Sequence, residues 1–309
     1  MRLVGSIKFT LAAVIVIALA VVVAGCGKST STPVTPSTGA TETQMPATSA
    51  QEDPAVVAQL PAAIKNRGAL FIATDASYPP NEFVAPDGKT LIGMDIDLAR
   101  ALGQVMGLDV VVKNATFDSI LPGLAANKYN AGMSSFTDTK EREKTVDMVT
   151  YLNAGTSFYT SGTGGTDIKG LDDLCGLSVA VEKGTTQADD AAAQSKTCEK
   201  AGDKPVNVLV LPDQNGANLA VVSKKADIGM ADSPVAAYIV KQSKGQLKLT
   251  GIAYGEAPYG IAMPKDNGLA APMLSALKVL IAGGQYKAIL AKWGLSDEAI
   301  TDPKINDGV

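Results

Sequence analysis

Residues 133–148, MSSFTDTKEREKTVDM, combine a run of hydroxyl side chains with one arginine that lies among alternating charges. Arg142 is expected in the first turn of a helix, where the helix dipole disfavours a cation. A guanidinium group is planar and binds a carboxylate through two parallel hydrogen bonds. The position of Arg142 therefore indicates that it binds an anionic group, whereas the charges beside it are predicted to face solvent.

Polar side chains collect at the ends of the predicted strands, including the strand before Arg142. They are Asp75, Ser134, Ser135, Thr137, Glu182, Thr185, Thr186, Gln187 and Asp232. Each has a simpler alternative role, since Asp, Ser and Thr side chains also cap helices. Taken together, Arg142 and the free N–H groups of a helix beginning near Thr186 suit a carboxylate, and Asp232 suits an ammonium group. The set predicts a site for a zwitterion, such as the backbone of a free amino acid.

These residues depend on an alternation of strands and helices that begins near residue 67. Gly107 is predicted to end one helix, and Pro122 is expected near the first turn of another. The βαβαβ order predicts a mainly parallel sheet covered by helices. The predicted elements of this half are strands 69–74, 108–113 and 130–135, with helices 94–107 and 118–129.

The same order repeats further along the chain, which predicts two similar α/β lobes. The glycine-rich residues 160–167 are expected to form a flexible crossing between them, and Trp293 is expected to anchor a core. Ligands of open α/β sheets bind beyond the carboxyl ends of the strands, so two facing lobes would share one cleft. The predicted elements of the second half are strands 177–182, 206–211 and 226–232, with helices 185–196, 215–225 and 233–243.

The composition restricts the classes of function. The 309-residue chain has a net charge of −4, which argues against a nucleic-acid binder. It contains no histidine, so the commonest general base and the commonest neutral metal ligand are missing. Neither a metal site nor a cofactor is predicted.

The N-terminus is predicted to be a targeting segment. Basic residues precede an apolar run that ends in VAGC at Cys26, as in the lipobox of bacterial lipoproteins, whose cysteine is acylated. A membrane-spanning helix is the alternative, because the run is nearly long enough. We expect residues 1–25 to be a signal peptide, Cys26 to carry lipid, and the Ser/Thr/Pro-rich residues 26–65 to form a tether.

Two cysteines remain in the predicted exported part. Cys175 and Cys198 are expected to form a disulfide, because disulfides persist outside the cytoplasm. Two free, buried thiols are the alternative, since the spacing alone does not show whether the sulfurs meet.

Four segments together resemble one protein family. GMDIDLARALGQVMG, SSFTDTKEREKTVDM, VAVEKGTTQ and GQYKAILAKWGL are similar to the polar amino-acid solute-binding proteins of bacterial ABC importers, extracellular solute-binding family 3. The resemblance implies a type II periplasmic-binding-protein-like fold in which each lobe is a mostly parallel sheet flanked by helices. It implies a ligand-closed cleft, a permease partner and a monomer at the outer face of the cell membrane. The implied division is lobe 1 at 66–160 and 254–300, lobe 2 at 161–253, and a C-terminal tail at 301–309.

The resemblance also implies roles for residues at matching positions. Arg142, assisted by Thr186, would bind the α-carboxylate of the ligand, and Asp232 and Thr137 would accept hydrogen bonds from its α-ammonium group. The other implied cleft residues are the aromatic Tyr78 and Phe117, the acidic Asp75 and Glu182, and the hydroxyl-bearing Ser134, Ser135 and Thr185.

The kind of amino acid depends on the two acidic residues. Asp75 and Glu182 would repel an acidic side chain and favour a cationic one, so arginine, lysine or ornithine is expected. Glutamine or another neutral polar amino acid is the alternative, because Asp75 also accepts from an amide, and Glu182 pointing to solvent would remove one of the two charges.

Two other classes of function use the same scaffold. A dehydratase or lyase acting on a small carboxylate would also use Arg142, but the chain lacks histidine and a Ser-x-x-Lys pair at a plausible nucleophile. A sensing module that presents its ligand to a membrane receptor would have identical binding chemistry. We expect an importer component rather than an enzyme.

Overall fold

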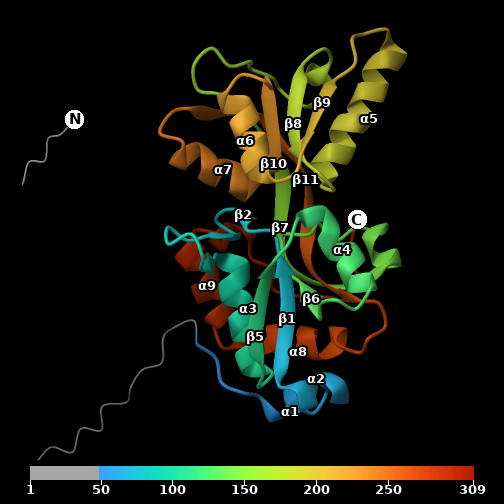
Figure 1. Ribbon diagram of the computed structural model, residues 1–309, viewed down its shortest axis with the longest axis vertical. Helices are drawn as coiled ribbons and strands as arrows, with labels where there is room; N and C mark the ends of the chain where they lie inside the picture. Colours follow the sequence, from blue (N-terminus) through green and yellow to red (C-terminus); the bar gives the residue numbers. More distant parts are fainter. Residues whose placement is uncertain (1–48) are drawn as a thin grey trace, which may run out of the picture. The chain divides into compact units, whose positions relative to one another are not determined.

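The computed structural model describes residues 49–309, which belong to one compact unit with two lobes (Figure 1). The predicted signal peptide, Cys26 and the first part of the predicted tether lie outside the described residues. Within residues 49–309, no helix combines the length and the hydrophobicity that a bilayer crossing requires.

Lobe 1 is built on parallel strands with helices on both sides. Strand β1 pairs with β5 on one edge and with β6 on the other. One face of helix α3 is wholly buried, with Leu98 and Leu102 at 0% exposure. Gly107, in the turn that follows α3, has a φ of +63°, a left-handed conformation that does not continue the helix. The elements are β1 (Ala69–Thr74), α3 (Met94–Val105), β5 (Asp109–Asn114), α4 (Phe117–Ala125), β6 (Ala131–Gly132), α8 (Ala270–Ala282) and α9 (Gln285–Trp293).

Two details of lobe 1 concern single residues. Trp293 packs against the lobe 1 core as expected, and its indole N–H donates to Asp97 at 2.8 Å. Pro122 lies inside α4 and not in its first turn, so the carbonyl group of Asp118 has no i+4 amide donor. A small antiparallel sheet at the mouth of the lobe comprises β2 (Ser77–Tyr78), β3 (Glu82–Val84) and β4 (Leu91–Ile92).

Lobe 2 repeats the alternation with three parallel strands. Cys175 and Cys198 form a disulfide with a Cα–Cα distance of 5.6 Å, as the sequence predicted. It connects the short 3₁₀ turn Leu171–Leu174 to the end of α5, against the core of the lobe. The elements are β8 (Ser178–Glu182), α5 (Thr186–Ala201), β9 (Asn207–Leu211), α6 (Gln214–Val222), β10 (Ile228–Asp232) and α7 (Ser233–Gln242).

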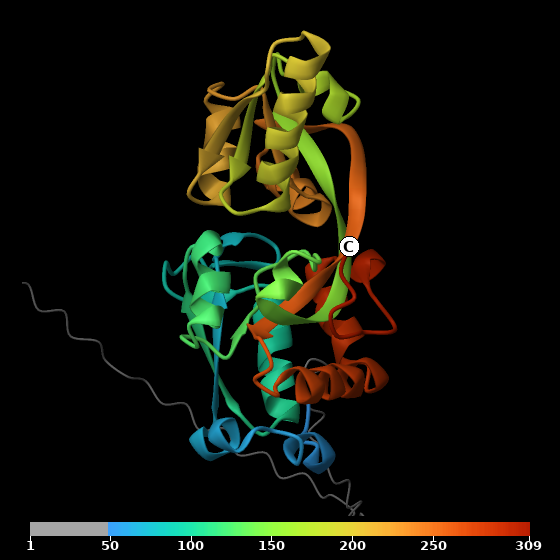
Figure 2. The same ribbon diagram turned by 90° about the vertical axis from the view of Figure 1, so that its right-hand side faces the viewer.

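Two long antiparallel strands, β7 (Val146–Ser161) and β11 (Leu247–Pro264), run through both lobes and join them (Figures 1 and 2). They join eight strands into one mixed sheet, in the order β5-β1-β6-β11-β7-β10-β8-β9. Their ladder is irregular between Thr250 and Ala257, at the crossing itself. The predicted crossing at residues 160–167 is therefore wrong, because that segment begins at the far end of β7, whose Phe158 and Tyr159 already pack in lobe 2.

The two ends of the described chain are more ordered than predicted. The tether was expected to extend to residue 65, but α1 (Pro54–Val57) and α2 (Ala62–Arg67) lie in its last part. Val56, Leu60 and Ile64 are buried in the lobe 1 core, which the polar composition of the residues before them did not indicate. Residues 301–309 are not a free tail either, since Ile305 forms a β-bridge with Val149.

Candidate functional site

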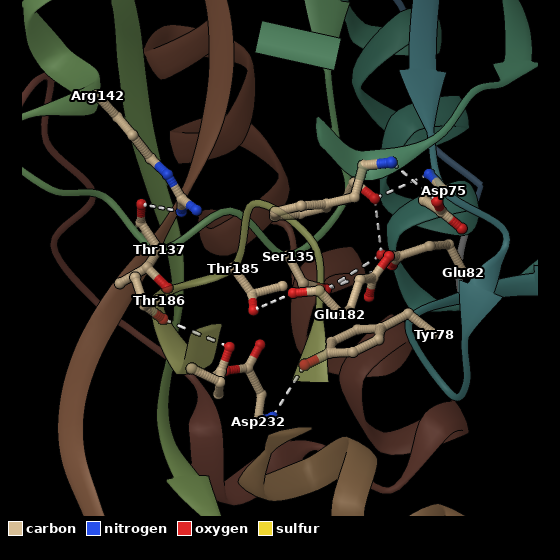
Figure 3. A pocket seen from close by; sticks show the side chains of 13 residues that line it. Asp75, Tyr78, Glu82, Ser135, Thr137, Arg142, Glu182, Thr185, Thr186 and Asp232 are labelled. Carbon is tan, nitrogen blue, oxygen red and sulfur yellow. Dashed lines mark hydrogen bonds between the residues drawn. The ribbon is translucent and has the colours of Figure 1, made fainter. Parts of the chain in front are cut away.

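The structure places every predicted ligand-binding residue around one pocket between the lobes (Figure 3). Lobe 1 contributes residues that follow β1 and β6, residues of β2 and β3, the first residue of α4 and the turn that contains Arg142. Lobe 2 contributes the last residues of β8 and β10 and the residues at the start of α5. The lining residues are Asp75, Tyr78, Glu82, Phe117, Ser134, Ser135, Thr137, Arg142, Glu182, Thr185, Thr186, Gln187 and Asp232.

Arg142 lies at one end of the pocket, in the 3₁₀ turn Arg142–Lys144 rather than in a full helix (Figure 3). Its Nη1 donates to the Thr137 carbonyl at 2.9 Å, and its Nη2 donates to the Gly184 carbonyl of the other lobe at 3.0 Å. The guanidinium group is 5.6 Å from the ring centroid of Phe117. Burial lowers the pKa of Arg142, yet arginine stays charged in proteins.

The start of α5 lies beside this end of the pocket. Thr185 is the N-cap, because its hydroxyl accepts from the Ala188 N–H at 3.2 Å, and Thr186 is the first helical residue. The backbone N–H groups of this helix start are a favourable environment for an anion. Gln187, which the sequence places among the polar residues after the strand that ends at Glu182, donates to Asp232 Oδ1 at 2.7 Å.

Asp232 and Tyr78 meet across the two lobes. The Asp232 N–H donates to the Tyr78 hydroxyl at 2.9 Å. Burial raises the pKa of Asp232, and the nearby hydroxyls of Tyr259 and Tyr78, the hydrogen bond from Gln187 and the charge of Arg142 oppose that rise. Asp232 is the N-cap residue of α7, but its side chain makes no capping hydrogen bond there. Its carboxylate is therefore available to a ligand donor.

Asp75 lies at the other end of the pocket from Arg142 and Thr137 (Figure 3). Its Oδ2 accepts from the Phe117 N–H at the start of α4, and its own N–H donates to Ser134 Oγ, both at 2.9 Å. Burial raises the pKa of Asp75, and the interactions of its carboxyl group with the Ser77 side chain and the Phe117 N–H do not fully offset the effect. The capping role and the pocket role of Asp75 are thus compatible, because a carboxylate accepts more than one hydrogen bond.

Glu182 faces the pocket and not the solvent. Its side chain is 2% exposed, and its Oε1 is buried without a hydrogen-bond partner. Burial raises its pKa to about 9, and the carboxylates of Asp75, Asp213 and Asp232 add to that rise. A buried carboxyl oxygen without a donor is unfavourable by itself, so the geometry favours a donor or a cation placed in the pocket.

Glu82 is a third acidic residue at this end, and the sequence analysis missed it. It accepts from the hydroxyls of Ser134 at 3.0 Å and Ser135 at 3.3 Å. Behind it lies Asp95, which accepts from the Tyr151 hydroxyl at 3.0 Å. Burial, followed by the charge of Asp95, raises the pKa of Glu82 well above its usual value. The only sequence signal was its place four residues after Tyr78, its partner across β2 and β3.

The lobes are closed on each other in this structure. Besides the contacts of Arg142 and Tyr78, Lys183 pairs with Asp118 at 2.7 Å, and the Gln214 N–H donates to Ser77 Oγ at 3.2 Å. The pocket contains four acidic side chains and one cationic side chain. This arrangement accommodates one anionic group beside Arg142 and cationic groups beside the acids.

No metal-binding arrangement of three or more His, Cys, Asp or Glu side chains occurs in the described part of the chain. The carboxyl groups of the pocket are held by hydroxyl and amide donors or lack a partner. The chemistry that they support is binding of a positively charged organic group.

Comparisons with known proteins agree with this geometry. Residues 70–296 match the family described as bacterial extracellular solute-binding proteins, family 3. The arginine-binding protein ArgT of Corynebacterium glutamicum is 34% identical over 255 residues, which span 82% of this chain and 83% of that protein. A solved structure of an ancestral arginine-binding protein bound to arginine has a TM-score of 0.67 at 34% identity and covers 74% of this chain and 98% of that one.

A second solved structure is that of an ancestral arginine-binding protein bound to glutamine, with a TM-score of 0.67, 34% identity, and coverage of 74% of this chain and 98% of that chain. The two-lobed α/β fold expected from the sequence is confirmed by these matches. The chain belongs to the bacterial extracellular solute-binding proteins, family 3.

Proposed function

We propose that this protein is the extracytoplasmic substrate-binding component of an ABC importer and binds a free cationic amino acid, with arginine as the first candidate. The observation that carries the proposal is the unpaired, buried Oε1 of Glu182, in a pocket that also contains Asp75 and Glu82. A cationic side chain supplies the positive charge that these carboxyl groups lack.

The orientation of the ligand follows from the positions of the charges. Its α-carboxylate binds Arg142 and the start of α5 at Thr186, and its α-ammonium group donates to Asp232 and Thr137. Its side chain then extends past Phe117 and Tyr78 toward Asp75, Glu82 and Glu182, which lie on the far side of the pocket. The three hydroxyl-bearing residues Ser134, Ser135 and Thr185 line the walls between the two ends.

Glutamine is the second candidate ligand. One solved relative is an ancestral arginine-binding protein bound to glutamine, and Asp75 accepts from an amide as well as from a guanidinium group. Glutamine leaves Glu182 without a counter-charge, so in that complex the Glu182 carboxyl group stays protonated. The proposal therefore ranks glutamine below arginine.

Ligand binding and lobe closure are one process in this proposal. The lobes are joined by β7 and β11, whose ladder is irregular at the crossing, and a ligand that contacts both lobes favours the closed form. The permease then recognises the closed form. A monomer suffices for this, because each part of the pocket comes from one chain.

We also propose that the chain is held at the outer face of the cell membrane by lipid on Cys26, with residues 1–25 removed as a signal peptide and the residues up to the start of α1 acting as a tether. The VAGC sequence supports this proposal. Metabolic labelling with a radiolabelled fatty acid tests it, since Cys26→Ala should remove the label.

The protein acts as a binder and not as an enzyme in this proposal. The chain has no histidine, and the carboxyl groups of its pocket are placed to pair with a cation. Incubation with each candidate amino acid, followed by mass spectrometry, should return the ligand unchanged.

A thermal-shift screen against the twenty amino acids, ornithine and citrulline tests the main proposal. Arginine at about 100 times its dissociation constant should stabilise the protein by about 2.7 kcal/mol. Calorimetry should then give tighter binding for arginine than for glutamine. Tighter binding of glutamate or aspartate than of arginine would overturn the proposal.

A further inference from the structure

Residues 304–309, here called the C-terminal strap, run along β7 and reach the turn that contains Arg142. The strap begins as a short extension of the sheet. The Thr150 N–H donates to the Lys304 carbonyl at 2.9 Å, and the Asn306 N–H donates to the Met148 carbonyl at 2.9 Å. The strap is thus fixed to lobe 1 before it reaches the pocket region.

The end of the strap binds both sides of the Arg142 turn. The Val309 N–H donates to the Asp138 carbonyl at 3.1 Å, and the Lys140 N–H donates to a main-chain oxygen of Val309 at 2.8 Å. The Gly308 N–H donates to Glu143 Oε1 at 2.8 Å. Thr137 and Arg142, which line the pocket, lie directly beside the residues that the strap holds.

Gly308 makes the closest approach of the strap. A Cβ atom at this position would lie 2.6 Å from both the carbonyl carbon and the carbonyl oxygen of Asp138. Real Cβ atoms do not come this close to backbone, so any larger residue at Gly308 would lift the strap.

The strap covers the side chain of Asp138. This side chain is 0% exposed, and neither of its carboxyl oxygens has a hydrogen-bond partner. Burial raises its pKa to about 7, and the Glu143 carboxylate adds to the rise, whereas the Asp307 backbone and Lys140 oppose it. An ionised Asp138 carboxylate would act on the Arg142 guanidinium group, in addition to burial and the charges of Asp232 and Asp189.

We infer that the strap keeps the Asp138 carboxyl group dry and uncharged, and that it thereby reserves the positive charge of Arg142 for the α-carboxylate of the ligand. Asp138 does not line the pocket, so it is a positioning residue that acts through Arg142. The inference rests on the proposed function, because it assumes that Arg142 binds the ligand carboxylate. Without the strap, water reaches Asp138, the carboxyl group ionises, and its charge competes for Arg142.

Three variants of the full chain test the inference, with L-arginine as the probe in calorimetry. The first ends after Pro303, the second is Gly308→Ala, and the third combines the truncation with Asp138→Asn. Gly170→Ala is the matched control, since a Cβ there meets no atom within 4 Å. The truncation removes Lys304 and Asp307 together, so the net charge does not change.

Truncation and Gly308→Ala should each weaken arginine binding by about tenfold at about pH 5–6, where Asp138 is uncharged in the intact chain and ionises beside Arg142 once it is hydrated. Asp138→Asn in the truncated chain should restore most of the affinity, because an amide cannot ionise. Gly170→Ala should bind as the wild type does. A strap that only stabilised the fold would not be rescued by Asp138→Asn.

The pH profile provides a second readout. Asp138 is uncharged below about pH 7 in the intact chain but ionises from about pH 4 upward once it is hydrated. The loss caused by truncation should therefore be largest between these values and should shrink as the pH rises above about 7. As the pH rises above about 7, the wild-type protein should lose affinity for arginine relative to the full-length Asp138→Asn variant.

The outcomes separate the inference from the proposed function. If wild type binds arginine and the truncated chain binds it equally well at every pH, the inference is wrong and the proposed function stands. An affinity loss that Asp138→Asn does not restore also overturns the inference. If wild type binds no amino acid, both are overturned.

Discussion

The two ends of the pocket differ in how completely their polar atoms are paired. At one end, Arg142 already donates to two carbonyl groups, and Gln187 holds Asp232. At the other end, Glu182 has an oxygen without any partner. A paired group keeps its geometry whether or not a ligand is present, whereas an unpaired buried carboxyl group gains most from a ligand that brings a donor.

This difference separates two tasks of the pocket. In the proposed binding mode, the end at Arg142 recognises what all amino acids share, and its preorganisation suits a constant group. The end at Asp75, Glu82 and Glu182 faces the part of the ligand that varies. Substitutions at the first end should affect every amino acid alike, and substitutions at the second should change the ranking among them.

The largest effect is expected for Arg142→Ala. The ligand carboxylate loses its charged partner in a buried site, which costs about 3–5 kcal/mol for arginine, lysine and glutamine alike. Calorimetry with each of the three amino acids checks this. Arg142→Lys keeps the charge but not the planar fork, so it should weaken binding less. Unchanged affinity in Arg142→Ala would show that Arg142 does not bind the ligand carboxylate.

Glu182→Gln should affect arginine and glutamine differently. It removes the counter-charge of the guanidinium group, so arginine binding should weaken by about 2 kcal/mol while glutamine binding changes little. Competition of glutamine against labelled arginine measures the ratio of the two affinities. An equal loss for both ligands would show that Glu182 does not discriminate between them.

The pH dependence of that ratio is a sharper test of Glu182. Its pKa is raised to about 9 when no cation is near, so a pocket holding glutamine keeps the proton, and a pocket holding arginine releases it. Glutamine binding therefore weakens relative to arginine binding as the pH rises from the ordinary glutamate pKa toward about 9. Glu182→Gln should make the ratio independent of pH across this range.

Asp75→Asn should have a smaller effect in the same direction. The asparagine oxygen still accepts from the Phe117 N–H, so the start of α4 is preserved. Arginine should lose about 1.5 kcal/mol, the value of a hydrogen bond to a charged group, and glutamine should lose less. Calorimetry with both ligands checks the difference, and a greater loss for glutamine would favour glutamine as the natural ligand.

The smallest effect is expected outside the pocket. Lys183 and Asp118 connect the lobes, but their side chains are 63% and 29% exposed. Lys183→Ala should change the affinity for arginine by about 0.5 kcal/mol or less, as for other exposed ion pairs. A loss as large as that of Glu182→Gln would mean that closure depends on the surface bridge more than on the buried charges.

The predictable parts of this protein are those with a local signal. Strand β1 and helix α3 follow their apolar periodicity, and the residues after each strand end came together because parallel strands finish at one edge. The crossing was misplaced because the glycines at 160–167 mark a turn at the end of β7, whereas β7 and β11 pass between the lobes as long strands with only an irregular ladder there. Glu82 was missed because its short strand has no periodicity of its own.

The amino-acid sequence by itself determined the family, the alternation of elements and the residue types around the pocket, since these follow from patterns within short segments. The direction of Glu182 was decided only by the tertiary structure, because the closing of one lobe on the other buries its carboxyl group. The same holds for the strap, whose residues 304–309 meet Asp138 and Lys140 more than 160 positions earlier in the chain. Packing over such separations is governed by chain topology, which no local pattern of residues encodes.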